Sequence, residues 1–282
     1  MDISLLTDAP KHNYALMRIA AYHKAKGDHV FLNEPLGRLY DMSYGSWLFN
    51  QEYFCDINGG PAIKPIGNRL GLEFPIRPDY SLYSNIDYSL GFTWEYCPRK
   101  CGFCVVPKQK PPKVHRSIWE FHDKRFKAIC LLNNNTFSDP KWYETFEEIW
   151  AAKLAVRDEN GYDLRLLDVD KVEALKRTKF EGYIHFSWDC MDDEDAVVKG
   201  LLLAREHKLR AMIYILVGYD TTRDEDIYRC QIINNLGFDP YPMPYNGGTR
   251  ADRAFKRFVC LRGYRGYRNM KVAWENYRPN RH

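Results

Sequence analysis

Three of the eight cysteines lie within eight positions of one another, at Cys97, Cys101 and Cys104 in the stretch "EYCPRKCGFCVVPK". The other five stand singly and far apart along the chain, at Cys55, Cys130, Cys190, Cys230 and Cys260. Isolated cysteines do not form the framework of a disulfide-stabilised protein. A tight cluster in such a chain indicates metal binding or redox chemistry, although accidental clustering of structural cysteines is the plain alternative.

The spacing C-x3-C-x2-C separates two kinds of metal site. Structural zinc takes four ligands, commonly as two separated pairs, but no second C-x2-C is present and the nearest histidine downstream is His115. A [4Fe-4S] cluster usually takes four thiolates, so three on one loop leave one iron open to an outside ligand. That arrangement favours a catalytic cluster. Lys100 lowers the cost of gathering thiolate charge, and Gly102 allows the backbone to approach closely.

The elements that must position this loop can be predicted from periodicity. Short apolar runs predict strands, and patterns with a period near 3.6 predict helices. The strands expected after the N-terminal region are 88–92, 128–132, 163–167, 183–188, 211–218 and 239–245. Helices are expected over 139–155 and 193–207, and a third should begin at a capping box of Thr222 with Glu225 and stop at Gly237. Strands that alternate with helices predict an α/β protein with a parallel sheet, wound as an open sheet or a partial barrel.

A strand–helix–strand pattern is also expected at the N-terminus. "ISLL" (3–6) and "HVFL" (29–32) predict two strands, and Leu16, Ile19, Ala20 and His23 predict one face of a helix that ends at Gly27. The Gly-, Pro- and Asn-rich stretch 50–80 predicts a boundary. We therefore expect a small Rossmann-like domain over 1–84, a larger α/β domain over 85–248 and a C-terminal extension over 249–282.

The cysteine spacing directly after the first strand of the larger domain, with Phe103 just before Cys104, resembles the signature of radical S-adenosylmethionine (SAM) enzymes. The resemblance implies a partial (β/α)6 barrel and a [4Fe-4S] cluster on Cys97, Cys101 and Cys104. It also implies that SAM chelates the open iron. Reductive cleavage then gives a 5′-deoxyadenosyl radical, with the electron supplied by an external reductant of the flavodoxin or ferredoxin type.

The resemblance extends to several cofactor-binding positions at strand ends, besides Phe103. It places the SAM amino group at Asn133, Asn134 and Asn135, although the "GGE" usual in the family is absent. Ser187 and Asp189 are expected at the SAM ribose or carboxylate, and Gly218 and Met243 beside the adenine. A helix cap or turn residue is the alternative for each polar side chain. No catalytic residue is assigned.

The N-terminal segment resembles the cobalamin-binding-like domains that precede some radical SAM barrels. The cobalt-binding pattern D-x-H-x-x-G is missing after Asp8, so cobalamin is not expected. His12 and His23 are interpreted as ordinary helix-region histidines. Methylthiotransferases share the cysteine spacing but carry a second three-cysteine set, whereas only Cys55 precedes Cys97 here.

Charge is distributed unevenly. The formal net charge is +4, but from Thr249 to His282 ten Lys and Arg face two acids, which gives +8 there and −4 over the rest. Aromatic residues alternate with these cations, a mixture that suits a nucleic acid or nucleotide through phosphate contacts and base stacking. An amphipathic helix with Phe255, Phe258 and Val259 on its apolar side is the alternative. No apolar run approaches the ~18 residues of a membrane helix, and the start lacks signal-peptide features, so a cytoplasmic protein with no membrane partner is expected.

The function expected from these patterns is radical SAM modification of a nucleobase, in nucleic acid or as a nucleotide, by rearrangement or group insertion. Two alternatives remain: a radical SAM enzyme acting on a peptide or small metabolite, and a non-enzymatic, metal-stabilised nucleic-acid-binding module. The sequence does not decide the substrate, the hydrogen abstracted, whether SAM is consumed or the oligomeric state.

Overall fold

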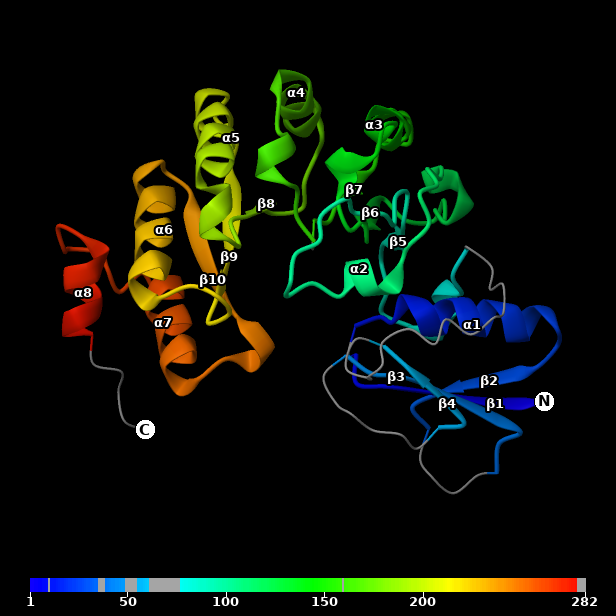
Figure 1. The fold of residues 1–282 in the computed structure, drawn as a ribbon. Helices are drawn as coiled ribbons and strands as arrows, with labels where there is room; N and C mark the ends of the chain where they lie inside the picture. Colours follow the sequence, from blue (N-terminus) through cyan, green and yellow to red (C-terminus); the bar gives the residue numbers. More distant parts are fainter. Residues whose placement is uncertain (10, 35–38, 49–54, 61–76, 159, 278–282) are drawn as a thin grey trace. The chain divides into compact units, whose positions relative to one another are not determined.

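The computed structural model describes residues 1–282 except 10, 35–38, 49–54, 61–76, 159 and 278–282 (Figure 1). The chain divides into two compact units. The first comprises Met1–Asn134 with Glu147–Val156, and the second comprises Asn135–Phe146 with Arg157–His282. Much of the predicted boundary over 50–80 lies outside the described residues, and the predicted domain limits remain predictions.

The first unit contains two parallel sheets. One has the order β2-β1-β3-β4 and the other the order β5-β6-β7. The strands are β1 (Asp2–Thr7), β2 (His29–Leu32), β3 (Met42–Ser46), β4 (Ile57–Gly59), β5 (Ser89–Gly91), β6 (Ala128–Leu131) and β7 (Ala155–Val156). The helices of this unit are α1 (Tyr14–Ala25), the short α2 (Val106–Gln109) and the 3-10 turns η1 (Tyr80–Leu82) and η2 (Ile118–Glu120).

Helix α1 connects the cores of both sheets. Asn13 caps its first turn by accepting a hydrogen bond from the Leu16 amide, and Leu16 packs with Ile3 and Leu5 of β1. Met17 lies on another face of the helix and packs with Leu90 and other residues of the β5–β6 region. The predicted strand–helix–strand start is therefore confirmed, because β1, α1 and β2 form a parallel crossover unit.

The second unit contains one parallel sheet of order β10-β9-β8, built from β8 (Ile184–Ser187), β9 (Ala211–Val217) and β10 (Asp239–Pro244). Its helices are α3 (Trp142–Ala151, whose second half, from Glu147, belongs to the first unit), α4 (Val169–Arg177), α5 (Glu194–Glu206), α6 (Arg223–Asn235), α7 (Arg250–Cys260) and α8 (Met270–Asn276). Its 3-10 turns are η3 (Thr136–Ser138), η4 (Leu164–Leu166), η5 (Met191–Asp193) and η6 (Tyr245–Gly247). Helix α6 packs against β9 and β10, and α7 packs against β10 (Figure 1).

Five of the six strands predicted after residue 85 are confirmed, and one is wrong. Residues 163–167 form η4, because the Asp163 carboxylate accepts a hydrogen bond from the Arg165 amide at 3.1 Å and is also bonded by the Arg165 guanidinium. This local bonding favours a tight turn over an extended strand. The strand of this region is instead the two-residue β7.

The predicted α/β class is confirmed, since every strand pairing in the described part of the chain is parallel. The six strands after residue 85 form two three-stranded sheets, and a parallel bridge joins Tyr162 to Phe186 at the edge of β8. The finer prediction of a (β/α)6 barrel stays a prediction. Among the described residues, no helix has the length and apolar character needed to cross a membrane.

Candidate functional site

The cysteine loop is the segment 92–105, which follows β5 and precedes α2. Its three cysteines are half-buried, and none of the eight cysteines of the chain is joined in a disulfide. The Cys104 amide donates to the Cys101 carbonyl at 3.0 Å, which forms a turn around Gly102. The loop presents its thiols on backbone that is free of strand or helix geometry over 92–105.

A buried asparagine from the neighbouring strand end holds the start of this loop. Asn133 is 2% exposed, and its Oδ1 accepts hydrogen bonds from the amides of Thr93 at 2.9 Å and Trp94 at 3.0 Å. Its Nδ2 donates to Thr93 Oγ1 at 2.8 Å. Asn134 is exposed and donates to the Glu95 carbonyl at 2.5 Å. The side chains of two of the three predicted SAM-binding asparagines, Asn133 and Asn134, are thus engaged with the loop that carries the cysteines.

The far end of the cysteine-containing segment is also fixed. The Arg116 amide donates to the Thr93 carbonyl at 2.9 Å, and this bond brings together the two ends of the segment 94–115. Glu148 of α3 then accepts hydrogen bonds from Ser117 Oγ at 2.6 Å and from the Ile118 amide at 2.8 Å. Both ends of the segment are therefore anchored within the first unit, while the cysteines lie between the anchors.

The segment that carries the cysteines is rich in positive charge. Between residues 95 and 113 the sequence holds one acid, Glu95, and five cations, namely Arg99, Lys100, Lys108, Lys110 and Lys113. The Lys113 ammonium lies 4.4 Å from the ring centroid of Tyr96. The electrostatics of the loop therefore suit an anionic occupant.

The residues present can be tested against an iron–sulfur cluster. The donor types fit, because the segment offers three thiols on one anchored, cationic loop. The three thiols are not close enough together to share a metal ion. Among the residues that the structure describes, no three Cys, His, Asp or Glu side chains form a group that could hold one. A shared cluster requires the loop to draw the three sulfur atoms together between its two anchors.

The β8–β10 sheet of the second unit has one half-buried face. Side chains alternate along β9, with Ile213, Ile215 and Val217 fully buried on one side and Tyr214 half-buried on the other. The strand register places Ser187 beside Tyr214, and Tyr214 beside Tyr241. Parallel sheets are normally covered on both faces. The half-buried face is therefore a candidate ligand surface.

Aromatic rings line this face. The rings of His185 and Tyr214 are stacked at 4.8 Å with an interplanar angle of 14°, and Tyr241 meets Tyr214 edge-on at 5.7 Å. Met243, which is 44% exposed, follows on the same side of β10. Two predicted cofactor-binding residues, Ser187 and Met243, are thus brought to one sheet face. The three rings were not among the residues predicted from the sequence. The period-two alternation of "YIHFSW" and "AMIYILVG" nevertheless predicts that His185 and Tyr214 lie on the less buried face of their strands.

Asp189 lies just beyond the end of β8 and has an unusual carboxyl group. Burial raises the pKa of the Asp189 carboxyl above its ordinary value, although the hydrogen bond from the Ser187 hydroxyl and the nearby guanidinium groups of Arg229 and Arg165 lower it. A half-buried carboxyl with a raised pKa at a strand end is a reasonable ligand-binding or proton-transfer group.

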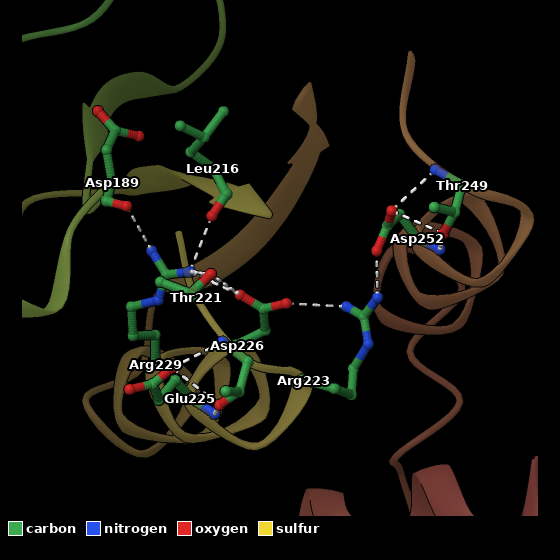
Figure 2. A network of polar contacts seen from close by, with 10 residues as sticks. Asp189, Leu216, Thr221, Arg223, Glu225, Asp226, Arg229, Thr249 and Asp252 are labelled. Atoms are coloured by element: carbon green, nitrogen blue, oxygen red, sulfur yellow. Dashed lines mark hydrogen bonds and ion pairs between the residues drawn. The ribbon is translucent and has the colours of Figure 1, made fainter. Parts of the chain in front are cut away.

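The backbone that carries Asp189 is held by a buried arginine of α6 (Figure 2). Arg229 is fully buried and donates through Nη1 to the Trp188 carbonyl at 2.7 Å and the Asp189 carbonyl at 3.1 Å. Its Nη2 donates to the Leu216 carbonyl at 2.8 Å and to Asp226 Oδ1 at 2.7 Å. One guanidinium thus ties together the ends of β8 and β9, a role that the sequence did not reveal.

The charge network continues from α6 to α7 (Figure 2). Arg223 is bonded to both Asp226 and Asp252. Asp252 in turn accepts hydrogen bonds from the amide of Thr249 at 2.8 Å and from its hydroxyl at 2.7 Å, within the capping box of α7. The network alternates in sign as Arg229, Asp226, Arg223 and Asp252. Such a chain of paired charges fixes the ends of two helices against the sheet.

Gly218, predicted to lie beside an adenine, has a structural reason of its own. It follows β9 with φ +76°, and a Cβ at this position would lie 2.9 Å from Asp252 Oδ2. The left-handed backbone therefore favours glycine here, and the close approach of Asp252 adds to that preference. Asn135 likewise has a local partner, because its Nδ2 donates to Asp163 Oδ2 at 3.0 Å.

The predicted site residues are divided between the units. The cysteines, Phe103, Asn133 and Asn134 belong to the first, whereas Asn135, Ser187, Asp189, Gly218 and Met243 belong to the second. We therefore describe each group within its own unit. No protein-family model matches the sequence, and the search of curated proteins found no relative. The chemistry of the two strand-end regions is therefore the basis for any functional assignment.

Proposed function

We propose that this chain is a radical SAM enzyme whose [4Fe-4S] cluster is held by Cys97, Cys101 and Cys104. The observation that carries the proposal is the cysteine loop: three thiols on a cationic segment after β5, anchored at both ends by Asn133 and Glu148. A bound cluster with SAM would supply a 5′-deoxyadenosyl radical, given one electron from an external reductant of the flavodoxin or ferredoxin type. The protein's own task is to bind, orient and shield the reactants.

The chain's residues divide this task. Asn133 and Asn134 position the start of the loop, and the surrounding cations offset the charge of the thiolates. Ser187 and Asp189 offer a hydroxyl and a carboxyl with a raised pKa for the polar groups of SAM. Arg229 donates to the backbone carbonyls of Trp188 and Asp189 and so orients the Asp189 side chain.

The aromatic face of the β8–β10 sheet favours a planar substrate. His185, Tyr214 and Tyr241 present ring surfaces and ring edges on the half-buried side, and bases stack on such rings. We therefore infer a nucleobase, in a nucleotide or a nucleic acid, as the substrate class, modified by rearrangement or group insertion. A peptide or a small metabolite is the alternative that product analysis would reveal.

The test is anaerobic reconstitution with iron and sulfide, followed by incubation of the dithionite-reduced protein with SAM. About four irons per chain and formation of 5′-deoxyadenosine are expected. Cys101→Ala should lose both, because two thiols cannot retain the cluster. Cys260→Ala, which removes an exposed thiol outside the loop, is the matched control and should retain both. Zinc in place of iron, or a full cluster that never cleaves SAM, would contradict the proposal and favour a metal-stabilised binding module.

A further inference from the structure

A set of arginines covers the exposed side of α7 and the turn that follows it. The arginine surface, as we define it, comprises Arg250, Arg253, Arg257, Arg265 and Arg268, all of which are exposed. The three in α7 have the spacing i, i+3 and i+7, which places them on one side of a helix. The opposite side packs into the protein through Phe255, Phe258 and Val259.

Most of these guanidinium groups have no counter-ion among the residues that the structure describes. Arg253 donates to the Gly248 carbonyl at 2.7 Å, but no hydrogen bond or ion pair within the described part of the chain involves the side chains of Arg250, Arg257, Arg265 and Arg268. Two neighbouring cations are paired: Arg262 with Asp239 at 2.8 Å and Lys271 with Asp224 at 2.8 Å. The fold thus leaves a particular subset of its positive charge available.

Helix stability does not account for the charge of Arg250. Arg250 is the first residue of α7, where the helix dipole favours an acid and disfavours a cation. The acid of that turn, Asp252, is buried and bonded to Arg223 and Thr249, so it does not offset the surface charge. Positive charge placed where it disfavours the helix is explained most simply by an anionic partner.

The aromatic residues of this segment do not serve that partner. Phe255, Phe258 and Tyr264 are buried. The ring centroids of Phe255 and Phe258 each lie 5.3 Å from that of Trp274, and Tyr264 meets Phe258 edge-on at 6.2 Å. Tyr267, at 47%, is the one exposed aromatic side chain in the described part of the segment. The sequence-based expectation of base stacking along the tail is therefore wrong for these buried rings, because they form the core that holds α7 and α8 in place.

We propose that the arginine surface binds the phosphate backbone of a nucleic acid without base stacking. Guanidinium groups make paired hydrogen bonds to phosphate, and every member of the set is an arginine. A membrane surface fits less well, because a membrane-binding helix presents an apolar face and that of α7 is buried in the protein. The proposal does not depend on the iron–sulfur cluster, since binding can be measured on the metal-free chain.

The experiment measures binding of fluorescently labelled duplex DNA of arbitrary sequence, by anisotropy, over a series of salt concentrations. With four or five phosphate contacts, the logarithm of the binding constant should fall with the logarithm of salt with a slope of about −4. The variant Arg250→Gln, Arg257→Gln, Arg265→Gln and Arg268→Gln should weaken binding at least about tenfold at low salt and bring the slope close to −1. Its thermal unfolding midpoint should match that of the wild type, because only exposed side chains change. If the midpoint falls, the double variant Arg257→Gln with Arg268→Gln is used in its place. Its slope should be about −2, because two phosphate contacts are lost.

A second variant removes the same charge from other exposed positions of the same unit. It carries Gln in place of four exposed cations of that unit: Lys179, Lys199, Arg205 and Lys208. This control should bind DNA like the wild type. An equal loss of DNA affinity in both variants would show that only the net charge matters, and would overturn the proposal.

Three other outcomes would also overturn the proposal. The first is no binding of DNA or RNA at low salt. The second is binding of polyglutamate or anionic vesicles in place of nucleic acid. The third is strong preference for a single strand that disappears in Tyr267→Ala, which would restore base stacking as the mode of recognition. Comparable binding of duplex and single strand supports phosphate recognition.

Discussion

Strand ends in two regions of this protein are held by buried polar side chains, and the two side chains differ in charge. Beyond β5, the neutral Asn133 amide bonds the backbone that leads into the cysteine loop. Beyond β8 and β9, the charged Arg229 bonds three carbonyls and is itself paired with Asp226. An amide can satisfy donors and acceptors without a counter-ion, whereas a buried guanidinium requires one.

The difference bears on what each region can do. The amide anchors one end of a half-buried segment and leaves the residues between its anchors able to rearrange around an occupant. The charge network joins β8, β9, α6 and α7. If one partner moves, the others are left buried without their hydrogen bonds, which is costly in free energy. We infer that the first region is built to adapt and the second to hold Asp189 and the sheet face in place.

The largest effect on stability is expected for Arg229→Met. Loss of the guanidinium leaves Asp226 buried without its closest cation and leaves the carbonyls of Trp188 and Leu216 without a donor. Breaking a buried pair in this way costs about 3–5 kcal/mol of the free energy of unfolding. Urea unfolding followed by circular dichroism measures the loss. Arg205→Met, at an exposed position of α5, is the control, and equal midpoints for the two variants would remove the contrast between the regions.

A smaller loss is expected for Asn133→Ala, since a neutral amide is replaced. The amides of Thr93 and Trp94 lose their acceptor in a buried setting, which should cost about 1–3 kcal/mol. Faster hydrogen exchange at residues 93–95 would locate the effect. Asn134→Ala, at an exposed position, should change stability by less than about 0.5 kcal/mol. A larger effect at Asn134 than at Asn133 would show that the anchor has been misplaced.

The Gly218→Ala substitution sharpens the comparison by probing the contact with Asp252. Alanine at φ +76° pays about 1–2 kcal/mol for the left-handed backbone, and its Cβ also displaces the Asp252 carboxylate. Gly237→Ala, at φ +88° with no atom within 4 Å of the added Cβ, pays the backbone cost alone. The difference between the two losses, measured by thermal unfolding, reports the contact. Equal losses would show that Asp252 tolerates the methyl group.

The smallest effect is expected from titration of Asp252. Burial alone would raise the pKa of its carboxyl, but the hydrogen bonds from Thr249 and the Arg223 guanidinium outweigh burial and hold the pKa below its ordinary value. A carboxyl with a lowered pKa in the folded state contributes stability that is fully present above the unfolded pKa of about 4 and is lost as pH falls through the folded pKa. The stability difference between wild type and Asp252→Asn should therefore shrink below about pH 4. A difference that grows on acidification would contradict this assignment.

Local patterns predicted much of the fold because the forces that set them are local. The alternation of "AMIYILVG" and the capping box of Thr222 with Glu225 lie within a few residues, and both elements are present as predicted. The prediction failed at 163–167, where a single carboxylate, Asp163, turned an apolar run into η4. The alternation in β8 and β9 indicates which face holds His185 and Tyr214, but their stacking and the role of Arg229 were not predictable. Each joins residues from elements that meet only after folding.

By itself, the sequence determined that the chain is an α/β protein with a cationic three-cysteine loop after a strand and an arginine-rich C-terminal segment. These are properties of composition, spacing and short-range periodicity. Only the tertiary structure decided that Asn133 anchors the loop, that the tail's aromatic rings are buried while its arginines are exposed, and that Arg229 supports Asp189. The physical reason is that burial and hydrogen-bond partnership depend on which distant segments pack together, and residue types alone do not specify that.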